Sequence, residues 1–314
     1  MRIVFMGTPE FAVPSLHALL KSDDQVIGIV TQPDRPKGRG QTLTPPPVKC
    51  IAQREQLPLL QPTKMKDPAF LAALAAWKPD LIAVAAFGRI LPPAILNLPP
   101  RGCLNVHGSL LPKYRGAGPI QWAIMNGETE TGITTMLMDE GMDTGAILLQ
   151  ERLAIVPDDT AGTLSPRLAE LGGRLLIKTI TQLKAGTLVP SQQDHSQATL
   201  APLLKKEDGV IDWTMSATAI ANRIRGLTPW PGAYTFAEGD RWTIWRAVAM
   251  VEQAKELPGT VTQVTKDAVY VATGHGVLVL TELQPANRRR MTVSQYLAGH
   301  PILVGSILGR FSHP

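Results

Sequence analysis

Cysteine is scarce in this chain: its 314 residues include only Cys50 and Cys103. Two cysteines are too few for a disulfide framework or a cysteine-based metal cluster. So low a count is typical of proteins from reducing compartments. We therefore expect two free thiols, no bound metal and a cytoplasmic location.

Long hydrophobic runs are also missing. The apolar N-terminal stretch is interrupted by Pro9 and Glu10, which is too early for a signal peptide. No uninterrupted apolar segment reaches the roughly 20 residues that a membrane-spanning helix needs. The sequence therefore predicts neither membrane insertion nor a membrane partner.

The chain has no extreme charge. Hydrophobic residues make up 44% of it and charged residues 18%, which is typical of a folded globular protein. The formal net charge of +5 permits a polyanionic partner without requiring one. A chain of this length is expected to form two domains.

The N-terminal region lacks most of the glycines of a dinucleotide-binding motif. Strands are predicted at residues 2–6 and 25–30, with a helix between them whose apolar residues have helical spacing. This order predicts an α/β Rossmann-like catalytic domain built on a parallel sheet. Gly7 is followed by Thr8 and Pro9 rather than by further glycines, so no NAD site is expected.

The C-terminal third has a different pattern. Residues 189–200 are rich in Ser, Gln and Pro and show no period, which is typical of a linker. After a helix predicted at 217–227, turn residues separate short strand candidates, as expected for a small β-barrel of the oligonucleotide-binding (OB) type. These candidates are residues 242–248, 259–264, 268–272 and 277–283. The predicted division is a catalytic domain at 1–188, a linker at 189–208 and an OB-type domain at 209–314.

One short stretch concentrates groups suited to acyl transfer. Asn105 and His107 alternate with Leu104 and Val106, which is the period of a strand, so the amide and the ring should share one face. The strand then enters a loop, and open α/β sheets place their ligand crevices at such strand ends. An amide can stabilise an oxyanion there, and an imidazole can donate to the same oxygen or move a proton.

A carboxylate would complete this set. Asp143 lies in the polar loop 139–145, from which it could orient the ring, raise its pKa or accept a proton from an attacking amine. A direct transfer between two nitrogens needs no nucleophilic side chain. The residues alone leave a second interpretation open, because Asn105 and His107 could be a turn-capping pair and Asp143 an Asx-turn residue.

A basic segment rich in proline and glycine spans residues 32–49. Its cations are Arg35, Lys37, Arg39 and Lys49. Pro and Gly exclude a regular helix or a central strand, so a long loop is expected. Long loops are either functional or merely solvated, and these rules leave both possibilities open.

Two segments resemble signature motifs of the folate-dependent formyltransferases: residues 105–112 (NVHGSLLP), continued by Arg115 and Gly116, and residues 139–145 (DEGMDTG). The resemblance continues through residues 32–40, 88–92, 211–213 and 229–231, so it covers nearly the whole chain. Two positions depart from the family pattern. Phe87 stands where many members have tyrosine, and Gly118 stands where alanine is usual.

The resemblance implies formyl transfer from 10-formyltetrahydrofolate to the α-amino group of initiator methionyl-tRNA. Nothing in the sequence demands more than one copy, so a monomer is expected. The resemblance gives catalytic roles to Asn105, His107 and Asp143. It places the folate against Ser109, Leu110, Leu111 and Pro112. It also assigns the tRNA acceptor end to Arg35, Lys37, Arg39 and Lys49, with Arg39 foremost, because guanidinium and ammonium groups bind phosphates.

Two alternatives remain. A formyltransferase for nucleotide-linked amino sugars would keep the same chemistry, although a small acceptor does not need a long basic loop. A nucleic-acid-binding protein that has lost catalysis would use the barrel-like C-terminal domain and the cluster Arg288–Arg290. The retained Asn105, His107 and Asp143 argue against this second alternative.

Overall fold

The structure is a computed structural model that describes residues 1–37, 40, 42–237, 239–252 and 254–309. It divides into two compact units. The first contains residues 1–119, 130–154 and 165–202, and the second contains 120–129, 155–164 and the chain from 203 onward. The units therefore do not separate at a single position, and the boundaries expected at 188 and 208 stay a prediction.

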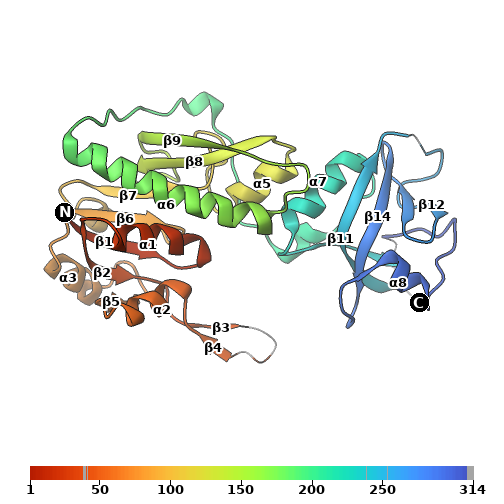
Figure 1. The fold of residues 1–314 in the computed structure, drawn as a ribbon, viewed down its shortest axis with the longest axis horizontal. Helices are drawn as coiled ribbons and strands as arrows, with labels where there is room; N and C mark the ends of the chain where they lie inside the picture. Colours follow the sequence, from red (N-terminus) through yellow and green to blue (C-terminus); the bar gives the residue numbers. More distant parts are fainter. Residues whose placement is uncertain (38–39, 41, 238, 253, 310–314) are drawn as a thin grey trace. The chain divides into compact units, whose positions relative to one another are not determined.

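A seven-stranded sheet forms the centre of the first unit, in the order β5-β2-β1-β6-β7-β8-β9 (Figure 1). The strands are β1 (Arg2–Gly7), β2 (Gln25–Val30), β5 (Leu59–Leu60), β6 (Leu81–Ala85), β7 (Cys103–His107), β8 (Glu130–Leu137) and β9 (Ile147–Ala154). The first five strands in this order, from β5 through β2, β1 and β6 to β7, pair in parallel. Strand β8 pairs antiparallel with both β7 and β9. The Rossmann-like sheet is confirmed for five strands. The last two strands form a hairpin because their short loop cannot make a parallel crossover.

Helices cover both faces of this sheet. They are η1 (Glu10–Ala12), α1 (Val13–Leu20), α2 (Pro47–Arg54), α3 (Pro68–Ala76), α4 (Pro93–Leu96) and most of α6 (Ala161–Ala185). On one face, Val84 and Cys103 share a buried core with Phe70 of α3 and Ile95 of α4. On the other face, Thr135 of β8 hydrogen-bonds Thr179 of α6 over 2.9 Å. The first unit is therefore a three-layer α/β structure.

Gly172 lets α6 lie close to the end of β7. A Cβ atom at this position would come within 2.9 Å of the Val106 side chain, closer than real Cβ contacts allow. The missing side chain thus sets the spacing between the helix and the strand that carries Asn105 and His107.

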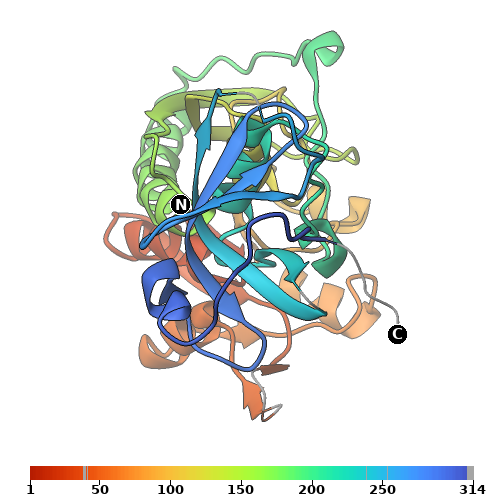
Figure 2. The same cartoon turned by 90° about the vertical axis from the view of Figure 1, so that its right-hand side faces the viewer.

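The second unit holds an antiparallel sheet in the order β10-β11-β14-β13-β12, with β15 paired to β14 (Figure 2). Its strands are β10 (Ala233–Ala237), β11 (Asp240–Met250), β12 (Val261–Val264), β13 (Val269–Ala272), β14 (Val277–Pro285) and β15 (Met291–Thr292). Its helices are α5 (Pro119–Met125), η3 (Lys206–Gly209), α7 (Ala217–Leu227) and α8 (Val293–Leu297). Trp242, Ile244 and Leu280 of the sheet share one core with Ile220 and Ile224 of α7. This confirms a separate antiparallel domain consistent with a small barrel.

The basic segment 32–49 has more regular structure than its prolines suggest. Strands β3 (Arg35–Lys37) and β4 (Thr42–Thr44) form a two-stranded hairpin, and α2 begins at Pro47. The expectation of an irregular loop was wrong here. Pro36 is tolerated because an isolated hairpin leaves one edge of each strand unpaired. Pro46 and Pro47 occupy the N-cap and the first helical position, where a helix needs no N–H donor.

The segment from Ser191 to Ala201 is fastened along the first unit. Ser191 pairs with Ile147, and Leu200 forms a parallel bridge with Arg115. The segment also includes the short helix η2 (His195–Gln197). Its apolar residues follow neither helical nor strand spacing because most of the segment is extended chain held by isolated bridges and side-chain contacts.

Both cysteines are free thiols: Cys50 is exposed and Cys103 is buried. Burial raises the pKa of the Cys103 thiol to about 12, so it stays protonated at neutral pH. Among the described helices, none combines the length and apolarity that crossing a membrane requires.

Candidate active site

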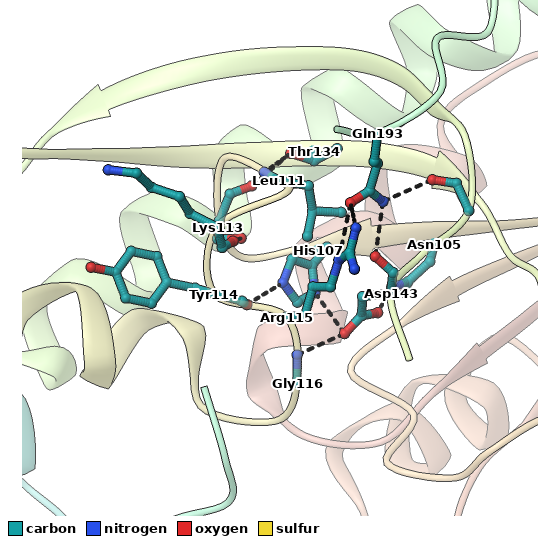
Figure 3. A network of polar contacts seen from close by, with 12 residues as sticks. Asn105, His107, Leu111, Lys113, Tyr114, Arg115, Gly116, Thr134, Asp143 and Gln193 are labelled. Carbon is teal, nitrogen blue, oxygen red and sulfur yellow. Dashed lines mark hydrogen bonds and ion pairs between the residues drawn. The ribbon is translucent and has the colours of Figure 1, made fainter. Parts of the chain in front are cut away.

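The three residues expected to do chemistry lie together at the end of β7 (Figure 3). Asn105 and His107 come from β7, and Asp143 comes from the loop between β8 and β9. The Asn105 Nδ2 lies 3.5 Å from Oδ1 of Asp143, and the His107 Nδ1 lies 3.7 Å from its Oδ2. Strand pairing brings these positions together because β7 and β8 are neighbours in the sheet.

Asp143 is held in an uncommon backbone conformation. Its φ angle is +53°, in the left-handed region that costs a non-glycine residue about 1–3 kcal/mol. Its Oδ2 accepts a 2.9 Å hydrogen bond from the main-chain N–H of Gly116. At Gly116 itself φ is +117°, and a Cβ would lie 2.7 Å from the Ala201 carbonyl oxygen, so only glycine fits there.

His107 has a fixed tautomer. Its Nε2 lies 2.9 Å from the carbonyl oxygen of Tyr114, and the ring is only 6% exposed. A carbonyl oxygen can only accept, so Nε2 carries a proton. In the neutral ring Nδ1 is then an acceptor facing a carboxylate. Nδ1 is thus the ring nitrogen that lies against Asp143, 3.7 Å from its Oδ2.

Asn105 is held more loosely. Its 3.5 Å contact with Asp143 is at the weak limit of a hydrogen bond, and the residue is half-buried. Turning this amide toward an oxygen of a ligand therefore costs little.

The segment 109–112 is fixed by β8 and β9. The Leu111 N–H donates to Thr134 Oγ1 over 3.1 Å, and the Leu111 carbonyl accepts from Gln150 Nε2 over 2.8 Å. Ser109 is buried, and its hydroxyl donates to the Lys113 carbonyl over 2.7 Å. Leu110 and Pro112 are half-buried, so their side chains are the more accessible part of this segment.

The basic residues of 32–49 have different surroundings. Arg35 is exposed, and its Nη2 donates to Gln32 Oε1 over 2.7 Å. Lys49 lies on α2, and its ammonium is 2.7 Å from a carboxylate oxygen of Asp34. Hydrogen bonds from Gln61 and from Lys49 lower the pKa of Asp34 below its ordinary value. Lys37 belongs to β3, whereas Arg39 lies outside the described residues.

Two residues that sequence reasoning did not place in the site are hydrogen-bonded next to it. Arg115 and Gln193 are both buried and hydrogen-bonded to each other, and Gln193 also donates to the Asp143 carbonyl over 2.8 Å (Figure 3). Arg115 belongs to a resembling motif, but Gln193 lies in the stretch interpreted as a linker and carries no sequence signal. The described residues contain no group of three or more His, Cys, Asp or Glu that could hold a metal ion.

The two departures from the family pattern have simple surroundings. Phe87 is 2% exposed within an apolar core, where its ring needs no hydrogen-bond partner. Gly118 donates its N–H to the Ala201 carbonyl over 3.0 Å. Neither position touches Asn105, His107 or Asp143 through a hydrogen bond found in the described part of the chain.

Comparison with protein families matches the chain in two parts. Residues 1–180 match the family described as formyl transferase, and residues 203–301 match the formyl transferase C-terminal domain.

Curated relatives are similar over nearly the whole chain. A methionyl-tRNA formyltransferase of Desulfotalea psychrophila is 54% identical over 308 residues, covering 98% of this chain and 95% of that protein. The enzyme of the same name from Trichlorobacter lovleyi is 51% identical over 307 residues, covering 98% and 96%. Among solved structures, an N-formyltransferase of Helicobacter canadensis in complex with folinic acid and dTDP-3-aminofucose has a TM-score of 0.68 at 18% identity. It covers 93% of this chain and 100% of that one, and at this identity the likeness shows the fold alone.

Proposed function

The chain belongs to the formyl transferase family, and from this premise we propose that it formylates initiator methionyl-tRNA, with 10-formyltetrahydrofolate as the formyl donor. The acceptor is the α-amino group of the methionine. The observation that carries the chemistry is the convergence of Asn105, His107 and Asp143 at the end of β7. Identity of about half over nearly the full length to methionyl-tRNA formyltransferases supports this acceptor.

The reaction exchanges one carbon–nitrogen bond for another. The amine attacks the formyl carbon, the bond from that carbon to the donor nitrogen breaks, and one proton moves from the amine to the departing nitrogen. Negative charge develops on the formyl oxygen during the attack. A preorganised donor at that oxygen is typically worth a hundredfold or more in rate.

Asn105 is proposed to supply that donor, because its amide is only weakly held by Asp143. His107 and Asp143 are proposed to carry the proton as a pair. The Tyr114 carbonyl occupies Nε2, which leaves Nδ1 and the carboxylate to exchange it. Because Nδ1 and Oδ2 lie only 3.7 Å apart, the proton is assigned to the pair rather than to either residue.

The donor is a second substrate, and we propose that Ser109, Leu110, Leu111 and Pro112 line its site. The backbone of Ser109 and Leu111 is held by Thr134 and Gln150, so the half-buried side chains of Leu110 and Pro112 are carried on a fixed segment that follows β7. An apolar wall with a few fixed polar groups is typical of pockets that bind a flat heterocycle.

For the acceptor end of the tRNA we propose Arg35, Lys37 and Arg39. Guanidinium and ammonium groups suit a phosphate backbone, and Arg35, at the start of the β3–β4 hairpin, is exposed. Lys49 is proposed to act indirectly, because its ammonium is already paired with Asp34 at the base of this segment. The second unit is proposed to bind tRNA as well, since Arg241, Arg246, Arg288 and Arg289 are exposed on it.

The test supplies the purified chain with 10-formyltetrahydrofolate and, in parallel reactions, methionyl initiator tRNA or an amino-sugar nucleotide. Formylated aminoacyl-tRNA is quantified by mass spectrometry after nuclease digestion. A preparation carrying Asn105→Ala measures background from contaminating enzymes. Formyl transfer to the amino sugar but not to the tRNA would support the sugar formyltransferase alternative instead of our proposal. Transfer to neither acceptor would contradict both.

A further inference from the structure

Gln193 connects a buried arginine to the backbone of the Asp143 loop. Its Oε1 accepts from Nε and Nη2 of Arg115 over 3.1 and 2.6 Å, and its Nε2 donates to the carbonyls of Asp143 and Gly145, both over 2.8 Å. The side chains of Gln193 and Arg115 are 6% and 7% exposed (Figure 3).

The chemistry of these partners fixes the orientation of the amide. A guanidinium has only hydrogen-bond donors, so the amide oxygen of Gln193 must face Arg115. A carbonyl oxygen only accepts, so the NH₂ group of Gln193 must face the carbonyls of residues 143 and 145. No other side chain of this size offers one acceptor on one side and two donors on the other. Glutamate has the same shape but would place a carboxylate oxygen against two carbonyl oxygens.

Residues 115 and 116 thereby hold Asp143 from two directions. The Gly116 N–H binds the carboxylate, while the Arg115 side chain acts through Gln193 on the Asp143 carbonyl. Asp143 has a left-handed backbone, which persists only where the surroundings support it. Arg115 makes a further contact that holds its guanidinium in place: its Nη2 lies 3.1 Å from His195 Nδ1.

We propose that Gln193 and Arg115 are positioning residues for the transfer reaction. They keep the Asp143 carboxylate against His107 and Asn105, although neither is proposed to touch a substrate. This inference rests on the proposed function for its kinetic test, and it assigns a role to the stretch that the sequence presents as a linker.

The sharpest variant is Gln193→Glu in the full chain, which keeps the size of the side chain and its attraction to Arg115 but loses both donors. Gln192→Glu is the matched control, because it makes the same charge change at the adjacent, exposed position. A misplacement of about 1 Å in an active site costs about a hundredfold in rate. We expect kcat to fall about 10- to 100-fold in Gln193→Glu, with KM for the formyl donor within about twofold of wild type. Gln192→Glu should match wild type.

A second measurement needs no activity. Amide hydrogen exchange should accelerate in peptides that cover residues 113–118 and 139–146 of Gln193→Glu, while peptides from β1 and β6 stay protected. Arg115→Lys, which keeps the charge but loses the forked donor geometry, should show the same exchange pattern.

The outcomes separate this inference from the proposed function. Kinetics are measured with whichever acceptor the wild-type chain formylates, so a different acceptor overturns only the function. Local acceleration of exchange together with a selective loss of kcat supports positioning. Unchanged exchange in both segments, or a kcat loss that merely follows the fraction of unfolded protein, would overturn it.

Discussion

The Gly116 N–H donates a 2.9 Å hydrogen bond to Oδ2 of Asp143, while Oδ1 of the same carboxylate faces the Asn105 amide at 3.5 Å. Each carboxylate oxygen therefore faces a donor. An asparagine at position 143 would have only one acceptor oxygen, so its NH₂ group would face either the Gly116 N–H or the Asn105 amide. The contacts therefore use both acceptor oxygens of the Asp143 carboxylate.

Asp143→Asn should lower kcat by about a hundredfold or more, because it removes the proton acceptor and turns one contact into a donor–donor contact. The unfolding midpoint should fall only modestly, since the amide can turn its oxygen toward the Gly116 N–H and keep that hydrogen bond. Steady-state kinetics and thermal unfolding check both statements. Asp139→Asn, in the same loop but exposed, serves as the control, and equal losses in the two variants would contradict a special role for Asp143.

Asn105→Ala should also cost about a hundredfold or more in kcat, as the loss of an oxyanion donor does. KM for the formyl donor should change less, because the interaction strengthens only as the charge develops. Asn97→Ala, at an exposed position after α4, is the control. Turnover within about twofold of wild type would remove Asn105 from the mechanism.

Arg39 and Lys49 should behave differently despite their equal charge. Arg39→Ala should weaken tRNA binding and lower the slope of log K against log salt by about 1, as the loss of one phosphate contact does. Lys49→Met should instead lower the unfolding midpoint with little change in that slope, because Lys49 is paired with Asp34. Binding titrations at several salt concentrations distinguish the two variants. A reduced slope in Lys49→Met would show that Lys49 contacts the tRNA directly.

The ion pair of Asp34 should make stability depend on pH. The pKa of Asp34 is lowered by Gln61 and Lys49, so its carboxylate stabilises the fold above the ordinary pKa of 3.8. This contribution disappears as the pH falls through the lowered value in the folded state. Asp34→Asn should therefore be less stable than wild type at pH 7, and the difference should shrink below about pH 4. Denaturant unfolding across this range tests the prediction, with exposed Asp23→Asn as control.

Gly172→Ala tests the close packing of α6 on β7. Alanine favours a helix over glycine by about 1 kcal/mol. The added Cβ, however, would lie 2.9 Å from the Val106 side chain, and such overpacking costs about 1–3 kcal/mol. We expect a net loss of stability in urea unfolding. Gly299→Ala, where a Cβ meets nothing within 4 Å, should be nearly neutral, and stabilisation by Gly172→Ala would show that the helix can shift.

The sequence by itself determined the fold class, and it predicted which side chains gather at the end of β7. Alternating residues placed Asn105 and His107 on one strand, and the helix predicted at 217–227 has the bounds of α7. These features depend on local spacing, so they can be read along the chain. Regular structure in 32–49 was missed because Pro46 and Pro47 act as a helix start, and Pro36 is tolerated only in an isolated hairpin.

Only the tertiary structure decided what surrounds those residues. The fixed tautomer of His107 depends on the Tyr114 carbonyl, and the pairing of Lys49 depends on Asp34, 15 positions away. Gln193 lies 50 residues from Asp143 in the sequence and follows no period, yet it bonds the Asp143 backbone. Such contacts arise when separate loops meet at the edge of a sheet, where one amide satisfies several buried groups at once. A single hydrogen bond between distant residues leaves no pattern in the local sequence, so only the folded chain reveals it.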